Sequence, residues 1–192
     1  VTSPGQMSAT IGHHFAHPTN HFWKCLYGSQ LTDRLLNPRE DGTLPKSYSL
    51  GLTNLVERPS AQAAELANTE FTAGVPALFQ KIIQRRPRIV CFVGKGIWDS
   101  FILKRTVSRK AKAEPFVYDL QPYKVIHTAP DATVHETLFS VVVSTSGLVA
   151  GYQLPEKIKQ FSALKKRVDE LRSGTLDTSS MTVLPIPKAL LN

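Results

Sequence analysis

The sequence predicts an α/β fold in which helices cover both faces of a short parallel sheet. Residues 88–93 (RIVCFV) and 138–143 (LFSVVV) are short runs that are apolar except for Arg88 and Ser140, which is typical of strands buried on both faces. Apolar residues recur at helical spacing over 70–86 and 158–171, so helices alternate with these strands. In such sheets ligands bind beyond the carboxyl ends of the strands, so we expect the chemistry in the polar loops there.

The first third of the chain is expected to contain turns, one helix and one strand. Residues 1–19 are rich in turn formers. Asn20 can cap a helix that Gly28 can end, because an amide side chain accepts from free N–H groups and glycine tolerates the left-handed region. Residues 29–47 are expected to be mostly loop with some helix, and residues 48–56 have the character of a strand.

Two further helices and a helical turn are predicted downstream. The helix over 70–86 contains Pro76, so it either starts near that residue or kinks there. After the first apolar strand, the sequence from Gly94 to Gly96 turns into a helix that runs through Phe101. The helix over 158–171 is amphipathic and has a basic outer face.

Length and composition indicate one domain, which we place at residues 1–172, followed by a loosely ordered C-terminal tail at 173–192. The hydrophobic share of 42% is enough for a sizeable core. The net charge of +8 favours polyanions, nucleic acid before an anionic membrane surface. No apolar run reaches membrane-spanning length and no signal peptide opens the sequence, so we expect a soluble intracellular protein.

A metal or cofactor site is not expected from the residue spacings. Cys25 and Cys91 lie in apolar patterns and are interpreted as core thiols. Four histidines within nine residues have spacings that zinc ligands can adopt, but Pro18 interrupts any continuous helix and no acidic residue or cysteine completes the set. They are His13, His14, His17 and His21.

Four segments, which together span most of residues 1–148, have the order and spacing of the conserved motifs of one known family. They are residues 2–26 (TSPGQMSATIGHHFAHPTNHFWKCL), 52–58 (LTNLVER), 89–101 (IVCFVGKGIWDSF) and 142–148 (VVSTSGL). Together they resemble the mismatch-specific uracil/thymine DNA glycosylase family.

This resemblance implies a three-layer α/β/α sandwich with a short parallel central sheet. It also implies a monofunctional DNA glycosylase, a hydrolase of base-excision repair that flips uracil or thymine opposite guanine and cuts the N-glycosidic bond. Some members also remove 5-formyl- and 5-carboxylcytosine. The partner would be double-stranded DNA with a mismatched or modified pyrimidine, with no cofactor and no membrane, and we expect a monomer located in the nucleus.

The resemblance assigns five residues to the base and the reacting bond. Phe15 matches the position that stacks on the flipped base. Asn54 matches the residue that bonds the base edge, for which an amide supplies both a donor and an acceptor. Ser8 matches a position near the pyrimidine C5 substituent, and Asn20 is placed in the same pocket. His14 is a candidate for positioning the base or a water, although packing or capping is an alternative for an isolated histidine.

Five further residues are expected to contact the DNA. Leu148 matches the wedge that fills the gap left by the extruded nucleotide. Lys95, Ser144 and Ser146 match phosphate-binding positions, and Gly147 lies between the last serine and the wedge. Hydroxyls and backbone N–H groups bind phosphates without reading sequence. Outside the resemblance, Lys95 would be a solvated charge and the serines a hydrogen-bonded turn.

Residues 1–5 (VTSPG) depart from the family motif Gly-x-Asn-Pro-Gly, in which the asparagine orients the attacking water. Ser3 occupies that position, and a serine is shorter and is not a base at neutral pH. A natural variant, an engineered slow mutant and a chain that binds without cutting all remain open. The alternative function is therefore a catalytically weak DNA-binding protein that recognises mismatched or modified bases.

The family motif follows a buried central strand, and that strand would lie before Val1. A parallel sheet without a central strand would expose backbone groups and core surface. We therefore expect either that the native protein extends upstream or that another segment replaces this first strand.

Overall fold

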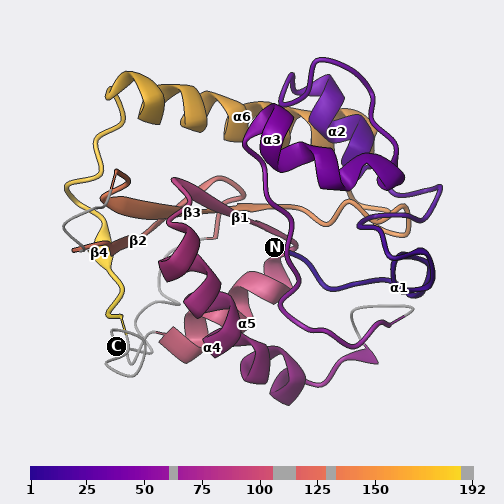
Figure 1. The fold of residues 1–192 in the computed structure, drawn as a ribbon, viewed down its shortest axis with the longest axis horizontal. Helices are drawn as coiled ribbons and strands as arrows, with labels where there is room; N and C mark the ends of the chain where they lie inside the picture. The colour runs from indigo at the N-terminus through magenta and orange to yellow at the C-terminus, as the bar shows by residue number, and fades with distance from the viewer. Residues whose placement is uncertain (61–64, 106–115, 129–132, 187–192) are drawn as a thin grey trace.

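The computed structural model describes residues 1–60, 65–105, 116–128 and 133–186, which form a four-stranded sheet between two layers of helices (Figure 1). Its strands are, in chain order, β1 (Ile89–Val93), β2 (Leu120–Ile126), β3 (Glu136–Val142) and β4 (Thr182–Val183). One layer contains α2 (Phe22–Gly28), α3 (Leu44–Tyr48) and α6 (Leu154–Ser173), and the other contains α4 (Asn68–Arg85) and α5 (Lys95–Arg105). The short helix α1 (Gln6–Ile11) lies at one end of the sheet, and the 3-10 helix η1 (Pro38–Thr43) precedes α3.

The sheet order is β1-β3-β2-β4, and its two predicted apolar strands are neighbours. β1 and β3 pair in parallel, from Ile89 opposite Leu138 to Val93 opposite Val142. Because their carboxyl ends coincide, the loops that follow the two strands leave the sheet at the same edge. The α/β class is confirmed, and so is the prediction that helices cover both faces.

The sheet is mixed rather than all-parallel, because β2 runs antiparallel to β3 while pairing in parallel with β4. β2 was not predicted from the sequence. Its sequence, LQPYKVI, lacks the uniform apolar run of a central strand, and Pro122 coincides with an irregular register between Leu120 and Lys124. A proline removes one ladder donor, which makes such a strand hard to recognise from its pattern.

Two other expectations are wrong. Residues 48–56 do not form a strand: α3 ends at Tyr48, Ser49 has a left-handed φ of 55°, and only Asn54 makes an isolated bridge, with Thr2. The tail is not loose over its described part, because β4 pairs with β2 and Leu184 is only 2% exposed. Residues 187–192 of the predicted tail lie outside the described residues.

Two apolar clusters hold the layers together, one on each face of the sheet. The cluster beneath the sheet contains four fully buried aromatic rings from α4, β1, α5 and β3, namely Phe79, Phe92, Phe101 and Phe139. The cluster on the other face joins α2, α3 and α6 to the ends of β1 and β3, through Trp23, Leu44, Phe161, Val93 and Val142. Among the described residues, no helix combines the length and the apolar character needed to cross a membrane.

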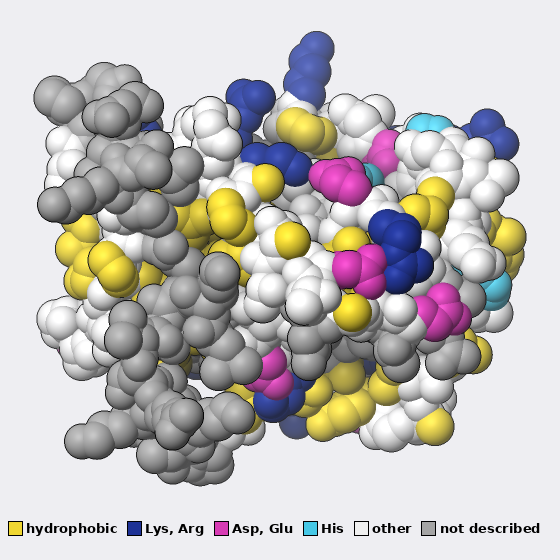
Figure 2. Space-filling view, turned by 90° about the horizontal axis from the view of Figure 1, so that it is seen from below, with side chains coloured by type: hydrophobic (Ala, Val, Ile, Leu, Met, Phe, Trp, Pro, Cys, Tyr) yellow, Lys and Arg dark blue, Asp and Glu magenta, His cyan; other side chains and the backbone are white. Residues whose placement is uncertain are grey.

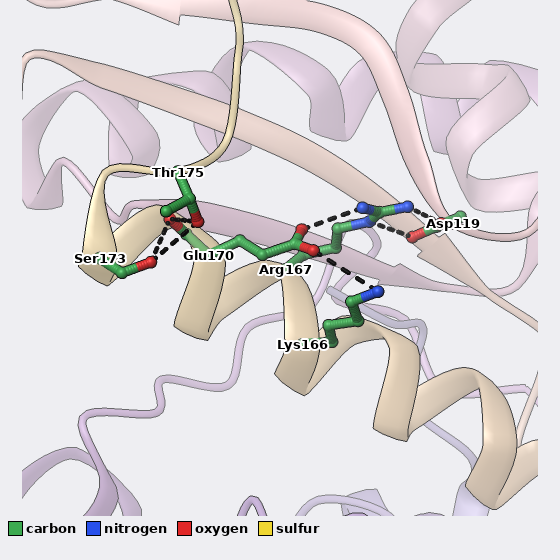
Figure 3. A network of polar contacts seen from close by, with 6 residues as sticks. All are labelled: Asp119, Lys166, Arg167, Glu170, Ser173 and Thr175. Atoms are coloured by element: carbon green, nitrogen blue, oxygen red, sulfur yellow. Dashed lines mark hydrogen bonds and ion pairs between the residues drawn. The ribbon is translucent and has the colours of Figure 1, made fainter.

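The basic outer face of α6 is largely paired with acidic side chains (Figure 3). Arg167 makes a two-point contact with Asp119, at 2.7 and 3.2 Å, and also bonds Glu170 at 2.9 Å. Lys166 lies 3.7 Å from the same Glu170. These contacts attach α6 to the segment before β2, so this part of the helix contributes little to the surplus positive charge of the chain.

Gly74 permits the close approach of α4 to the segment that carries Asn54. A Cβ atom at position 74 would lie 1.8 Å from the carbonyl oxygen of Leu55. We expect Gly74→Ala to lower the free energy of unfolding by about 1–3 kcal/mol, because the overpacking exceeds the ~1 kcal/mol gain in helix propensity. Chemical denaturation measures this, with Gly96→Ala in α5 as the matched control, since a Cβ there meets nothing within 4 Å. Equal stability of the two variants would contradict the tight contact.

Candidate active site

Residues 1–5 run between the edge of β1 and the segment around Asn54. The amino group of Val1 donates to the carbonyl of Cys91 at 2.6 Å, and the Val93 N–H donates to the carbonyl of Val1 at 2.9 Å. On the other side, Thr2 accepts from the Leu55 N–H at 2.8 Å and donates to Thr53 at 3.1 Å. The half-buried Ser3 follows Thr2, so the backbone pairing fixes Ser3 close to Asn54.

The amide oxygen Oδ1 of Asn54 is buried and has no hydrogen-bond donor among the described residues. An unpaired buried acceptor costs about 1–3 kcal/mol. Folding therefore gains nothing from this oxygen, and a ligand that brings an N–H group would restore the missing bond. This is the property expected of a residue that binds the edge of a base.

Phe15 is held in a strained backbone conformation beside this segment. Its φ is 53°, in the left-handed region that non-glycine residues rarely adopt, and its side chain is 9% exposed. The ring stacks on Phe22 with centroids 3.7 Å apart, which occupies one face of the ring. The same apolar cluster includes Val93, the last residue of β1, and Leu52, two residues before Asn54, packs against it.

Hydrogen bonds on both sides of Phe15 maintain this conformation. On one side, the Ala16 N–H donates to Ser8 Oγ at 3.1 Å, which ties the turn to α1. On the other, the His14 N–H donates to Asp41 Oδ2 at 2.9 Å, and His13 Nδ1 lies 3.0 Å from Oδ1 of the same carboxylate. Ser8 and His14 therefore help to shape the segment that presents Phe15.

Burial lowers the pKa of His14, and Asp41 only partly opposes this effect. The imidazole is therefore neutral near pH 7. Burial alone would raise the pKa of Asp41, but the hydrogen bonds from His14 and His13, together with the electrostatic attraction of the two histidines, lower it below its ordinary value. A carboxylate from η1 thus anchors the two histidines, and this contact across 28 residues has no local pattern in the sequence that would predict it.

Asp41→Ala tests whether this anchor matters. We expect a loss of about 1–3 kcal/mol in the free energy of unfolding, because the His14 N–H loses its acceptor in a half-buried position. Thermal unfolding measures this loss. Asp41→Asn, which keeps one acceptor oxygen, should fall between the two proteins, and an Ala variant as stable as the unmodified chain would contradict the anchor.

The 144–148 loop follows β3 and extends toward the α1 end of the molecule (Figure 1). Within it, the Ser146 N–H donates to Ser144 Oγ at 3.3 Å and the Leu148 N–H donates to Ser146 Oγ at 3.2 Å. Both hydroxyls act as acceptors in these bonds, so each keeps an O–H donor for another partner. Leu148 is 75% exposed, the most exposed of the large hydrophobic residues in the described part of the chain.

This loop is docked on the segment that leads into α2. The His21 N–H donates to the carbonyl of Thr145 at 2.9 Å. At Gly147, an added Cβ would lie 2.6 Å from the carbonyl oxygen of Thr19, so only glycine permits this approach. Asn20 Oδ1 accepts from the Phe22 N–H at 2.9 Å, but the N-cap of α2 is His21 and not Asn20 as predicted. The amide nitrogen of Asn20 is left for a further acceptor.

Lys95 lies at the start of α5, at the same sheet edge, but its charge is partly compensated. Its ammonium group lies 2.5 Å from Asp99 Oδ2 and 4.9 Å from the centre of the Phe116 ring. On the face of the molecule shown in Figure 2, the described basic side chains stand singly or beside acidic ones and form no continuous patch. A phosphate at Lys95 would therefore compete with Asp99.

The four clustered histidines have separate surroundings. His13 contacts Asp41, the ring of His17 lies 2.9 Å from Thr19 Oγ1, and His21 Nδ1 lies 3.4 Å from Lys157 Nζ. No group of three possible metal ligands occurs in the part of the chain that the structure describes.

Comparison with known proteins shows which family the sequence resembles. The family described as "Uracil DNA glycosylase superfamily" matches residues 2–172. The chain is also 34% identical, over 176 residues, to a G/U mismatch-specific uracil DNA glycosylase of Schizosaccharomyces pombe. The aligned region covers 88% of this chain and 50% of that protein, so the chain spans about half the length of this curated relative.

Proposed function

The chain belongs to the uracil DNA glycosylase superfamily, and we propose that it is a monofunctional DNA glycosylase that hydrolyses the N-glycosidic bond of uracil opposite guanine. The observation that carries this proposal is the buried, unpaired Oδ1 of Asn54, held beside Ser3 by backbone pairing. Support also comes from the relative in Schizosaccharomyces pombe, whose name states the same activity.

In this proposal the uracil nucleotide leaves the duplex and its base enters the site. Leu148, which is 75% exposed, fills the gap in the stack, and Ser144 and Ser146 use their free O–H groups on phosphate oxygens. The free face of Phe15 stacks on the base. Asn54 Oδ1 accepts the imide N–H of uracil, and its amide group donates to a carbonyl oxygen.

The reaction breaks the bond between C1′ of the sugar and N1 of the base. The bonding electron pair leaves with N1, so the base departs as an anion and the sugar becomes oxocarbenium-like. A water then forms the new C1′–O bond and loses a proton to solvent or to the base. The amide N–H2 of Asn54 stabilises the charge that develops on the base, because a fixed donor in a dry site needs no reorganisation. The Ser3 hydroxyl orients the water, and the neutral His14 adds no charge that would oppose the oxocarbenium.

A second candidate function is a DNA-binding protein that recognises the mismatched or modified base and hydrolyses it slowly. Ser3 favours this candidate, because a hydroxyl is shorter than an amide and cannot act as a base at neutral pH. Both candidate functions use Phe15, Asn54 and Leu148 in the same way. They differ only in whether Ser3 orients the attacking water well enough for rapid hydrolysis.

The proposal extends to other bases and to the cellular setting. Ser8 leaves little bulk near the C5 position, which supports the excision of thymine and of 5-formyl- or 5-carboxylcytosine opposite guanine. The Ser8 hydroxyl is engaged with the Ala16 N–H, so its role toward such a substituent is to leave space rather than to donate. We further propose that the protein acts as a monomer on nuclear DNA.

The direct test incubates the protein with duplexes that carry uracil, thymine or 5-carboxylcytosine opposite guanine, in excess of enzyme over DNA. Alkali then converts abasic sites into strand breaks. We expect breaks at uracil first, and the ranking of the other two bases tests the role of Ser8. Base-dependent binding without breaks would favour the second candidate, and the absence of both in folded protein would overturn the proposed function.

A further inference from the structure

Lys157 is a fully buried lysine that lies directly beneath the 144–148 loop. It is the fourth residue of α6 and its relative exposure is 0%. Its ammonium group donates to the carbonyl oxygen of Ser146 at 2.8 Å and lies 3.4 Å from His21 Nδ1. Burial lowers the pKa of Lys157, and burial, with the nearby Lys157 charge, lowers the pKa of His21, so the imidazole is neutral and can accept from the ammonium.

The energetics of this lysine do not favour a role in folding alone. Taking an ammonium group out of water is costly, and an apolar side chain of similar shape would pack between α6 and α2 without that cost. A buried charge of this kind is explained when its hydrogen bonds fix something that an apolar residue would leave free.

What it fixes is the backbone of the 144–148 loop. One turn along the same face of α6, Gln160 Oε1 accepts from the Val143 N–H at 2.7 Å. Gln160 therefore holds the chain just before the loop, and Lys157 holds it in the middle of the loop. The Ser146 carbonyl also accepts from the Val149 N–H at 3.3 Å. It therefore has two donors, the Lys157 ammonium and the Val149 N–H.

The orientation of this carbonyl determines where the next N–H points. The C=O and the N–H of a trans peptide point in opposite directions, so turning the Ser146 carbonyl inward turns the Gly147 N–H outward. Gly147 is exposed, and its N–H has no acceptor in the described part of the chain. An outward N–H beside the free hydroxyl donors of Ser144 and Ser146 suits a phosphate oxygen of the DNA backbone.

We propose that Lys157 is a positioning residue that fixes the Ser146–Gly147 peptide, and thereby presents the Gly147 N–H to a DNA phosphate and Leu148 to the base stack. This inference rests on the proposed function, because the loop has no such task without DNA. It differs from the role of the basic surface residues, since the Lys157 ammonium is buried and acts on the DNA only through the loop.

The test uses Lys157→Met, which keeps the length of the side chain and removes the ammonium. The control is Lys159→Met, which removes the same charge from an exposed position of the same helix. The duplex carries uracil opposite guanine and 2-aminopurine beside the uracil, because 2-aminopurine fluoresces when its stacking is disturbed. Excision rate, fluorescence rise and unfolding temperature are measured for each protein.

We expect Lys157→Met to unfold at or above the temperature of the unmodified chain, because a buried charge has been removed. Its excision rate should fall by about 10- to 100-fold and its fluorescence rise should shrink, because the loop is no longer aligned. Lys159→Met should lose little. In a Leu148→Ala background the additional effect of Lys157→Met should largely disappear, since both changes act on the same step.

Lys157→Gln supplies a neutral donor and should recover part of the rate, which also provides a second variant if the methionine form does not fold. Equal rates and fluorescence for Lys157→Met and Lys159→Met would overturn the positioning role while leaving the proposed function intact. A Met variant that is merely unstable, with normal excision at low temperature, would also overturn it. If the unmodified chain neither disturbs 2-aminopurine nor excises uracil, the proposed function itself fails.

Discussion

Asn54→Ala is expected to excise uracil about 100- to 1,000-fold more slowly than the unmodified chain under single-turnover conditions. The removal of one preorganised donor from a developing anion typically costs this much. Here the same amide also supplies an acceptor, Oδ1, that is buried and unpaired in the protein alone. The variant should fold at least as well as the unmodified chain, because the buried acceptor without a donor is lost together with its cost.

Asn54→Asp refines this prediction by retaining the shape of the side chain. A carboxylate keeps acceptor oxygens but has no N–H donor, and its negative charge opposes the departing base anion. It should therefore be as slow as the alanine variant or slower. Excision by both variants at the rate of the unmodified chain, in protein with unchanged thermal unfolding, would remove Asn54 from the site.

Ser3→Asn is expected to accelerate uracil excision by about 10- to 100-fold without changing the affinity for uncleaved DNA. The longer amide reaches further toward the sugar and can both donate to and accept from the attacking water, and orientation of a reactant contributes on this scale. The position is well defined, because the backbone of Thr2 pairs with the Asn54 segment and Pro4 accepts from the Ser60 N–H at 3.1 Å.

The Ser3 prediction is measured as a rate and an affinity on the same duplex. Ser3→Ala provides the comparison: if the hydroxyl orients the water, the alanine variant should be slower than the serine form. A gain at Ser3→Asn with little change at Ser3→Ala would mean that the Ser3 hydroxyl contributes little, which favours the weakly catalytic candidate. No gain at Ser3→Asn would contradict the assignment of this position to the water.

The sequence predicts well those elements whose own pattern of apolar residues indicates both the type of element and its burial. The short apolar runs of β1 and β3 indicate buried strands, and the spacing before β1 indicates α4 even with Pro76 inside it. β2 and β4 were missed, because a strand with a proline and a two-residue edge strand have no such pattern and depend on their neighbours.

The residues of the candidate site also fall into those that the sequence predicts and those that only the structure reveals. Phe15, Asn54 and Leu148 were identified through a family resemblance, and the structure adds a strained φ, an unpaired acceptor and a high exposure to these positions. Asp41 and Lys157 could not be identified, because Asp41 lies 28 residues from His13, and Lys157 lies 11 residues from Ser146 and 136 from His21, with no local pattern that links them. Only folding brings such side chains beneath the loops that they hold.

The central claim is that the pocket of Phe15 and Asn54 holds a flipped pyrimidine. The measurement that tests it most directly is the affinity for a duplex with 2′-fluoro-deoxyuridine opposite guanine, in which the fluorine destabilises the oxocarbenium-like sugar and so prevents cleavage. We expect binding at least about tenfold tighter than to the same duplex with cytosine opposite guanine, as one good base contact is worth 1.4 kcal/mol or more. We also expect Asn54→Ala to remove this preference. Equal affinity for the two duplexes, at several salt concentrations, would contradict the claim.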